Sequence, residues 1–155
     1  MEHYRQDLVL EAPPAAVYAA LTTAAGLKAW WTQDCDVPPG VGASLVFRFG
    51  PNRKQMQVER LVPGAEVAWL CTGAHIAVGE LTRRDEWVGT RLVFRLEPSG
   101  DGHTRLQFAH LGLVPQFACF AMCSAGWQHF LASLAQYCRT GQGTPYVDSP
   151  AMAVS

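Results

Sequence analysis

The sequence has little charge and no block of charge of either sign. Charged residues make up 16% of its 155 positions, and 12 basic and 13 acidic side chains are scattered along it, leaving a net charge of −1. A nucleic-acid partner or an anionic membrane surface would call for a basic patch, which is missing. We therefore expect a folded domain that binds neither nucleic acid nor a membrane.

Signals for export, membrane insertion and disulfide bonding are also missing. The N-terminus has no basic segment followed by an apolar stretch, and no apolar run reaches transmembrane length. The 5 cysteines are odd in number and lack the spacing of a disulfide framework, which favours reduced thiols. The sequence thus predicts a cytoplasmic protein.

Familiar catalytic and metal-binding motifs are absent as well. There is no glycine-rich phosphate loop, and Ser124 has no nucleophile-elbow context. Cys119 and Cys123 lie one helical turn apart without a second pair, which favours core packing over a metal site. We expect no metal and no cofactor, we identify no catalytic residue, and a binding role is favoured over enzymatic activity.

Apolar and aromatic residues, in contrast, are plentiful. The apolar fraction is 49%, with 5 tryptophans and 7 phenylalanines, enough to fill a core or to line a pocket. Residues 1–141 are predicted to form a single domain. Residues 142–155, rich in proline, serine and alanine, are predicted to form a flexible tail.

Hydrophobic periodicity predicts the order of the elements. A strand over residues 3–11 precedes two short helices over 15–21 and 24–31, and a long helix over 115–139 closes the domain. Between them, residues that alternate between apolar and polar predict antiparallel strands with one buried face, at 44–50, 55–62, 66–72, 90–97 and 104–111. Residues 73–86 are predicted to be a loop, a candidate lid over an opening.

Four local patterns resemble those of a known family. They are Ala12-Pro13-x-x-x-Val17-Tyr18-x-x-Leu21 with Leu27-x-x-Trp30-Trp31, Trp87-x-Gly89-Thr90-x-Leu92-x-Phe94, Thr104-x-Leu106-x-Phe108-x-His110-x-Gly112, and Gly126-Trp127-x-x-Phe130-Leu131-x-x-Leu134. Over roughly residues 5–141 the chain resembles the START-like (SRPBCC) superfamily, and within it the branch named after the activator of the heat-shock-protein-90 ATPase. The resemblance implies an α+β helix-grip fold, in which a curved antiparallel β-sheet wraps around a long C-terminal α-helix, with two short helices after the first strand.

The resemblance also implies an internal apolar cavity, although members of the superfamily differ widely in function. Our first hypothesis is a domain that binds a small apolar ligand such as a lipid, a polyketide or an aromatic metabolite. The inward-facing residues that would line the cavity are Trp31, Phe47, Phe49, Met56, Trp69, Leu92, Phe94, Phe108, His110, Phe120, Trp127 and Leu131. A filled core made by the same residues is the competing interpretation.

His110 is the one polar residue that alternation points inward, on the strand face of Leu106 and Phe108. We expect a buried, neutral histidine, hydrogen-bonded to backbone or to Trp or Tyr neighbours, that would anchor a ligand. Two alternatives remain open. A cyclase or hydrolase would need a second polar group beside His110, such as Tyr18 or Glu80. A co-chaperone or regulatory domain would have a filled core and an exposed apolar patch, and a homodimer would be one form of it.

Overall fold

Seven strands form one open antiparallel sheet that curves around helices on one side. The structure, a computed structural model, describes residues 4–38, 40–49, 52–75, 88–100, 102–112 and 120–145. Its elements are β1 (Tyr4–Leu10), α1 (Pro14–Thr22), α2 (Ala24–Trp30), β2 (Asp34–Asp36), β3 (Ser44–Phe49), β4 (Asn52–Val62), β5 (Glu66–His75), β6 (Arg91–Pro98), β7 (Thr104–Leu111) and α3 (Phe120–Thr140). The strand order is β1-β7-β6-β5-β4-β3-β2. This arrangement confirms the α+β helix-grip fold expected from the sequence.

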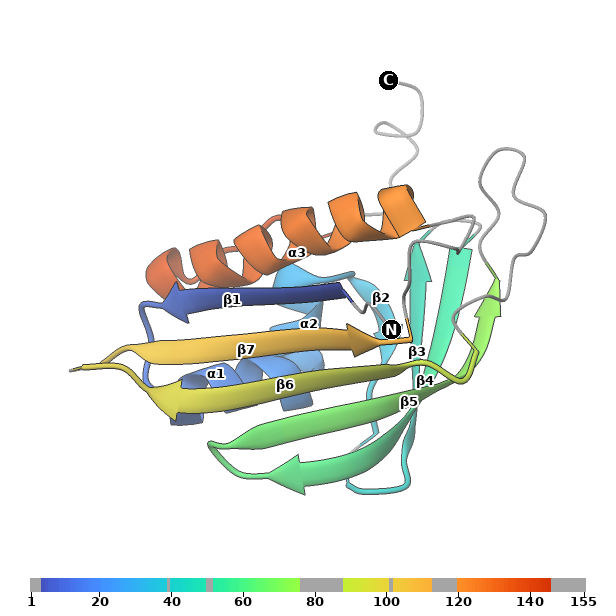
Figure 1. The fold of residues 1–155 in the computed structure, drawn as a ribbon, viewed down its shortest axis with the longest axis horizontal. Coiled ribbons are helices and arrows are strands. Elements are labelled where there is room, and N and C mark those ends of the chain that lie inside the picture. The colour runs from blue at the N-terminus through green and yellow to red at the C-terminus, as the bar shows by residue number, and fades with distance from the viewer. Residues whose placement is uncertain are drawn as a thin grey trace.

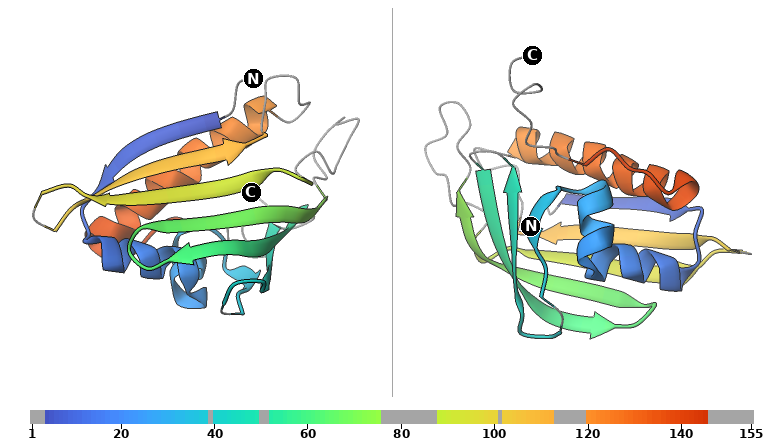
Figure 2. Two further views of the ribbon diagram at one scale, coloured as in Figure 1. Left: turned by 60° about the horizontal axis from the view of Figure 1, so that its bottom comes forward. Right: turned by 180° about the vertical axis from the view of Figure 1, so that it is seen from behind.

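All three helices lie on the concave side of the sheet. Helix α3 runs lengthwise beside β1, and the view from behind shows α1 and α2 against the same side (Figures 1 and 2). The apolar core fills the space between this side of the sheet and the helices. Among the described residues, no helix is long and apolar enough to cross a membrane.

Two β-bulges bend the middle of the sheet. Val58 pairs with Trp69 but Arg60 pairs with Ala68, so β4 carries one extra residue at this point. A second register shift lies near the other end of the β4–β5 pair, between Gln55 and Met56 of β4. Because a bulge bends its strand and increases the local twist, these two shifts help β4 and β5 to wrap around the helices, as Figure 2 shows.

The strands differ from the sequence prediction at three places. Strand β5 continues to His75 and β4 begins at Asn52, because the two strands pair as far as Arg53 and His75. Residues 73–75 are therefore strand and not loop, while the rest of the candidate lid lies outside the described residues. The short strand β2, which the sequence did not predict, pairs with β3, where Arg48 forms ion pairs with Asp34 and Asp36. The predicted start of the long helix at residue 115 also lies outside the described residues.

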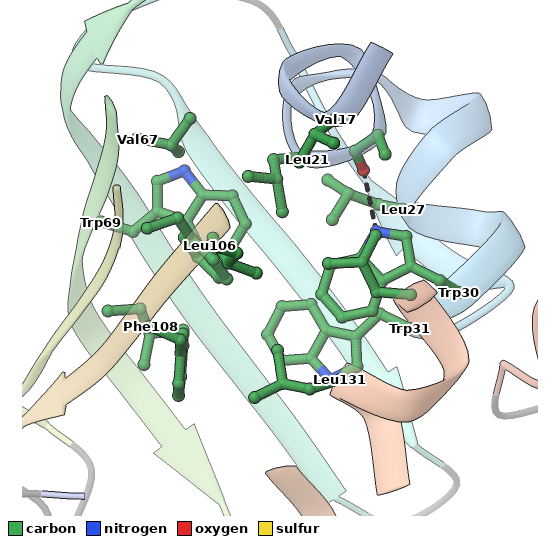
Figure 3. Packing of buried hydrophobic residues seen from close by; sticks show 14 of the residues in the cluster. Val17, Leu21, Leu27, Trp30, Trp31, Val67, Trp69, Leu106, Phe108 and Leu131 are labelled. Carbon is green, nitrogen blue, oxygen red and sulfur yellow. Dashed lines mark hydrogen bonds between the residues drawn. The ribbon is translucent and has the colours of Figure 1, made fainter. Parts of the chain in front are cut away.

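The corner between α1 and α2 carries the tryptophan pair into the core. Thr23 ends α1 and caps α2, where its hydroxyl accepts a hydrogen bond from the Gly26 N–H at 3.0 Å. The two helices approach so closely that a Cβ on Gly26 would lie 2.6 Å from the Cα of Ala20. The Trp30 indole N–H donates to the Ala20 carbonyl at 2.8 Å, the bond drawn in Figure 3. This bond fixes the end of α2, and Trp31 follows directly.

The chain after α3 returns to this corner. Gly141 has a φ of +86° and ends the helix. The Ser133 hydroxyl donates to the Trp30 carbonyl and accepts from the Thr144 N–H, at 2.8 and 2.7 Å. Residues as far as 144 are thereby tied to α2 and α3. The flexible tail predicted for residues 142–155 stays a prediction, because most of it lies outside the described residues.

Candidate functional site

Aromatic rings from both layers meet in the interior and form a closed circuit. The ring centroids are 6.1 Å apart for Trp31 and Trp69, 5.3 Å for Trp69 and Phe94, and 5.0 Å for Phe94 and Phe108. They are 4.5 Å apart for Phe108 and Trp127, and 5.4 Å for Trp127 and Trp31. Aromatic pairs at these separations attract one another beyond the effect of burial alone. We call these five residues the aromatic circuit, part of which is seen in Figure 3.

The circuit is buried and joins every layer of the fold. Each of its five side chains is at most 2% exposed. Trp31 comes from the end of α2, Trp127 from α3, and the others from β5, β6 and β7. Phe47 of β3 packs on Trp31, with ring centroids 4.3 Å apart. The apolar stripe of the long helix and the alternation of the strands therefore converge on one place.

His110 lies beside the circuit and is hydrogen-bonded on both ring nitrogens. The Trp127 indole N–H points at Nδ1, 3.0 Å away, and Nε2 lies 2.8 Å from the Thr90 hydroxyl oxygen. Because an indole N–H can only donate, Nδ1 must accept and therefore carries no proton. The proton of the neutral ring sits on Nε2, which can donate to Thr90. The three side chains form a buried polar chain, which we call the His110 chain.

Burial keeps this histidine uncharged. Its side chain is fully buried, and burial, helped by the nearby positive charge of Lys54, lowers the pKa of His110 to about 3. At neutral pH the ring is therefore neutral, with Nδ1 accepting from Trp127 and Nε2 able to donate to Thr90. The expectation of a buried, neutral histidine bonded to a tryptophan agrees with this geometry.

Lys54 brings a positive charge to the inner face of the sheet. It follows the same alternation as Met56, which is completely buried, and in the sheet it lies between Phe47 of β3 and Ala74 of β5. Its charge acts on Cys71 as well as on His110. Burial raises the pKa of the Cys71 thiol to about 11, against the smaller opposing effects of a backbone hydrogen bond to Gly73 and of Lys54. Cys71 is therefore a protonated thiol at neutral pH.

The predicted lining residues fall into two groups. The residues whose side chains the structure describes lie together, buried in one core cluster or in contact with it. They are the aromatic circuit, Phe47, His110, Met56, Leu92 and Leu131. The side chains of Phe49 and Phe120 lie outside what the structure describes, and so does Glu80, one candidate partner for His110. Tyr18, the other, is half-buried on α1. Whether the lining residues bind a ligand stays a prediction.

Two polar residues of the site were missed by the sequence reasoning. Thr90 precedes β6 in phase with Leu92 and Phe94, so the same alternation places it on the inner face. Lys54 was missed because the strand predicted at 55–62 begins one residue after it. The predicted strand 90–97 already contained Thr90, and extending the predicted strand 55–62 back by one residue would have reached Lys54.

Next to Trp69, a hollow of about 20 Å³ lies between α1 and strands β3 to β5. This volume is enough for one water molecule and too small for an organic ligand. The part of the chain that the structure describes holds no cluster of three histidine, cysteine or acidic side chains arranged to bind a metal ion.

The fold and this interior define a helix-grip protein with an aromatic core and one buried polar chain. Residues 11–139 match the sequence model of the family described as "Activator of Hsp90 ATPase homolog 1-like protein". The match spans most of the chain, so the chain belongs to this family. A comparison with curated proteins finds no match.

Solved structures agree with this assignment. The solution structure of the Aha1 dimer from Colwellia psychrerythraea is 31% identical, with a TM-score of 0.78, and the alignment covers 92% of this chain and 100% of that one. DynU16, a protein from the dynemicin biosynthetic locus, is 21% identical over 92% of this chain and 49% of its own, with a TM-score of 0.71. An HSP90 activator from Plasmodium falciparum is 15% identical over 92% and 98%, with a TM-score of 0.68. The last two similarities concern the fold alone.

Proposed function

We propose that this protein binds a small, mostly apolar molecule, such as a lipid, a polyketide or an aromatic metabolite, inside the helix grip. The hollow beside Trp69 is too small for such a molecule, so binding requires side chains of the interior to move apart. The observation that carries the proposal is the His110 chain within the aromatic interior. Ligand sites are lined mainly by apolar and aromatic side chains, with a few polar groups that fix the orientation of the ligand. A carbonyl or hydroxyl group at the end of an apolar body would bind His110 by replacing Thr90 or Trp127 as a partner of the ring.

Lys54 favours a ligand with an acidic group. The positive charge of Lys54 lies close enough to His110 to help lower its pKa. A carboxylate placed beside Lys54 would be paired with a cation, and it could accept a hydrogen bond from His110 Nε2 by replacing the Thr90 hydroxyl. A fatty acid or an aromatic acid should therefore bind more tightly than the matching alcohol.

Tryptophan fluorescence can test this, because Trp31, Trp69 and Trp127 lie in the circuit. We expect decanoate to quench it and to bind more tightly than decanol. Lys54→Gln should weaken decanoate binding about tenfold, close to 1.4 kcal/mol, and leave decanol binding within about twofold. Lys28→Gln is the matched control, because this exposed lysine lies on α2. Quenching by neither compound, together with a ligand-free mass for the protein purified from its source, would contradict the proposal.

A second candidate is regulation of an Hsp90 ATPase, for which the family match and the 31% identity to an Aha1 protein are the support. The ATP turnover of purified Hsp90 from the same source should then rise when the protein is added. Because that relative is a dimer, we also propose a homodimer, which sedimentation velocity would detect at twice the mass of the chain. An unchanged turnover would argue against the second candidate and leave ligand binding untouched.

A further inference from the structure

The outer face of the sheet, opposite to the helices, carries a hollow of about 340 Å³. It crosses β1, β7 and β6, the three strands that Figure 1 shows side by side in front of α1. We call it the outer groove. Its lining residues are Arg5, Asp7, Val93, Arg95, Gln107, Phe108, Ala109 and Leu111.

The groove exists because small side chains lie between long ones. Strand pairing places Arg5, Ala109 and Val93 in one row across the sheet. The next row holds Asp7, Gln107 and Arg95. Ala109 is only 7% exposed although it points away from the core, because longer side chains surround it. The groove therefore has an apolar floor at Ala109 and Val93, with an exposed arginine on each side.

The charge of the groove is predominantly positive. Asp7 is paired with Arg105 at 3.2 Å, and Glu66, the cross-strand neighbour of Arg95, is paired with Arg60 at 3.3 Å. Asp7 and Glu66 are thus already engaged by other arginines, while Glu97, exposed on the same face two residues after Arg95, is not among the residues that line the groove. Within the described part of the chain, Arg5 and Arg95 take part in no ion pair. Both are exposed on the outer face.

We propose that the outer groove binds an acidic segment of a protein partner, with carboxylates at Arg5 and Arg95 and a small apolar side chain on the floor of Ala109 and Val93. The two arginines are two strands and two residues apart, so their Cα atoms are separated by about 12 Å. An extended chain covers about 10–13 Å in three to four residues, which matches two acidic residues with small residues between them. A guanidinium binds a carboxylate through two parallel hydrogen bonds, so the interaction depends on the orientation of the two groups as well as on their charges.

This surface is independent of the interior. Phe94 and Phe108 of the aromatic circuit alternate along β6 and β7 with the groove residues Val93, Arg95 and Ala109, so the two sets lie on opposite faces. Phe108 also borders the groove, but its side chain is only 1% exposed and its ring packs on Trp127 in the circuit.

Fluorescence anisotropy with the full-length protein tests the proposal. The probe is a fluorescein-labelled peptide with glutamates separated by two alanines, EAAEAAE, and its control carries glutamine in place of each glutamate. We expect the acidic peptide to bind and the glutamine peptide not to bind. The double variant Arg5→Glu/Arg95→Glu should weaken binding at least tenfold. The double variant Arg53→Glu/Arg139→Glu changes the net charge equally at exposed positions elsewhere and should stay within twofold.

Several results would overturn the proposal. They are the absence of binding, equal weakening in both double variants, or amide chemical-shift changes that avoid residues 5, 95, 107 and 109. A groove variant that dissociates a homodimer would also overturn it, because the groove would then be covered by a second copy. Should the double variant unfold, Arg5→Gln and Arg95→Gln, each with an unchanged melting temperature, provide the same comparison.

Discussion

At the scale of single residues, His110 makes the stability of the fold depend on pH in a defined direction. Its pKa falls from an unfolded value of 6.5 to about 3 in the folded protein. Between these values the unfolded chain binds a proton that the folded chain does not. Acid therefore favours unfolding through this group.

We expect the free energy of unfolding to fall as the pH drops from 6.5 toward 3, by up to about 1.4 kcal/mol per pH unit from His110 alone. Above pH 6.5 this contribution should not change. Urea unfolding of the wild type and of His110→Gln at pH 7, 6, 5 and 4 measures it, because the difference between the two proteins isolates His110 from the carboxylates. Parallel profiles would contradict the assignment of a buried neutral ring.

The sequence predicted the inward position of His110 but not its hydrogen-bond partners. Alternation along 104–111 places His110 on the inner face, and that much is local. Its hydrogen bonds to Trp127 and Thr90 span 17 and 20 positions of the chain. The periodicity of a single element carries no information about partners so far away in the sequence. The partners of His110, and therefore its tautomer, are set only by the packing of α3 against the sheet.

At the scale of elements, two glycines in helices have opposite structural roles. Gly26 lies where α2 touches α1, and an added Cβ would lie 2.6 Å from the Cα of Ala20 and 2.7 Å from its carbonyl oxygen. Gly126 lies in α3 with nothing within 4 Å of the same position. The sequence marks both simply as glycines within helical segments.

Gly26→Ala should therefore destabilise the protein, since overpacking typically costs about 1–3 kcal/mol. Gly126→Ala should instead stabilise it by about 0.5–1 kcal/mol, because alanine loses less backbone entropy in a helix. Urea denaturation of both variants beside the wild type gives the two changes. The packing at the α1–α2 corner would have to be revised if the two substitutions shifted stability in the same direction.

Strand boundaries show the same contrast between local and non-local information. The hairpin of β6 and β7 was predicted closely, because its turn residues and its alternation are neighbours in sequence. Strand β2 has just three residues, and it exists through pairing with β3 and the ion pairs of Arg48. The extra length of β4 and β5 depends likewise on mutual pairing.

At the scale of the whole molecule, the two faces of the sheet differ in their chemistry. The inner face carries the aromatic circuit, the His110 chain and Lys54, while the outer face carries the positively charged groove. Alternation along a strand separates the two sets of side chains by the thickness of the sheet.

We therefore expect the two proposed binding activities to be separable. Arg5→Glu/Arg95→Glu should leave decanoate binding within about twofold of the wild type, and Lys54→Gln should do the same for the EAAEAAE peptide. Fluorescence titration and anisotropy of both variants give all four values. Loss of both activities in a single variant would mean that the variant disturbs the fold or that the two faces are coupled.

The sequence by itself determined the class of fold, the order of the main elements and the inward set of apolar residues, because these depend on periodicity and turn chemistry within short segments. It also determined the family, whose match covers residues 11–139. The tertiary structure alone decided what these residues do together: the closure of the circuit from Trp31 to Trp127, the Thr90 and Trp127 partners of His110, the inward position of Lys54 and the groove over Ala109. Each of these joins residues from different elements, and their distances are set by the packing of the sheet against the helices.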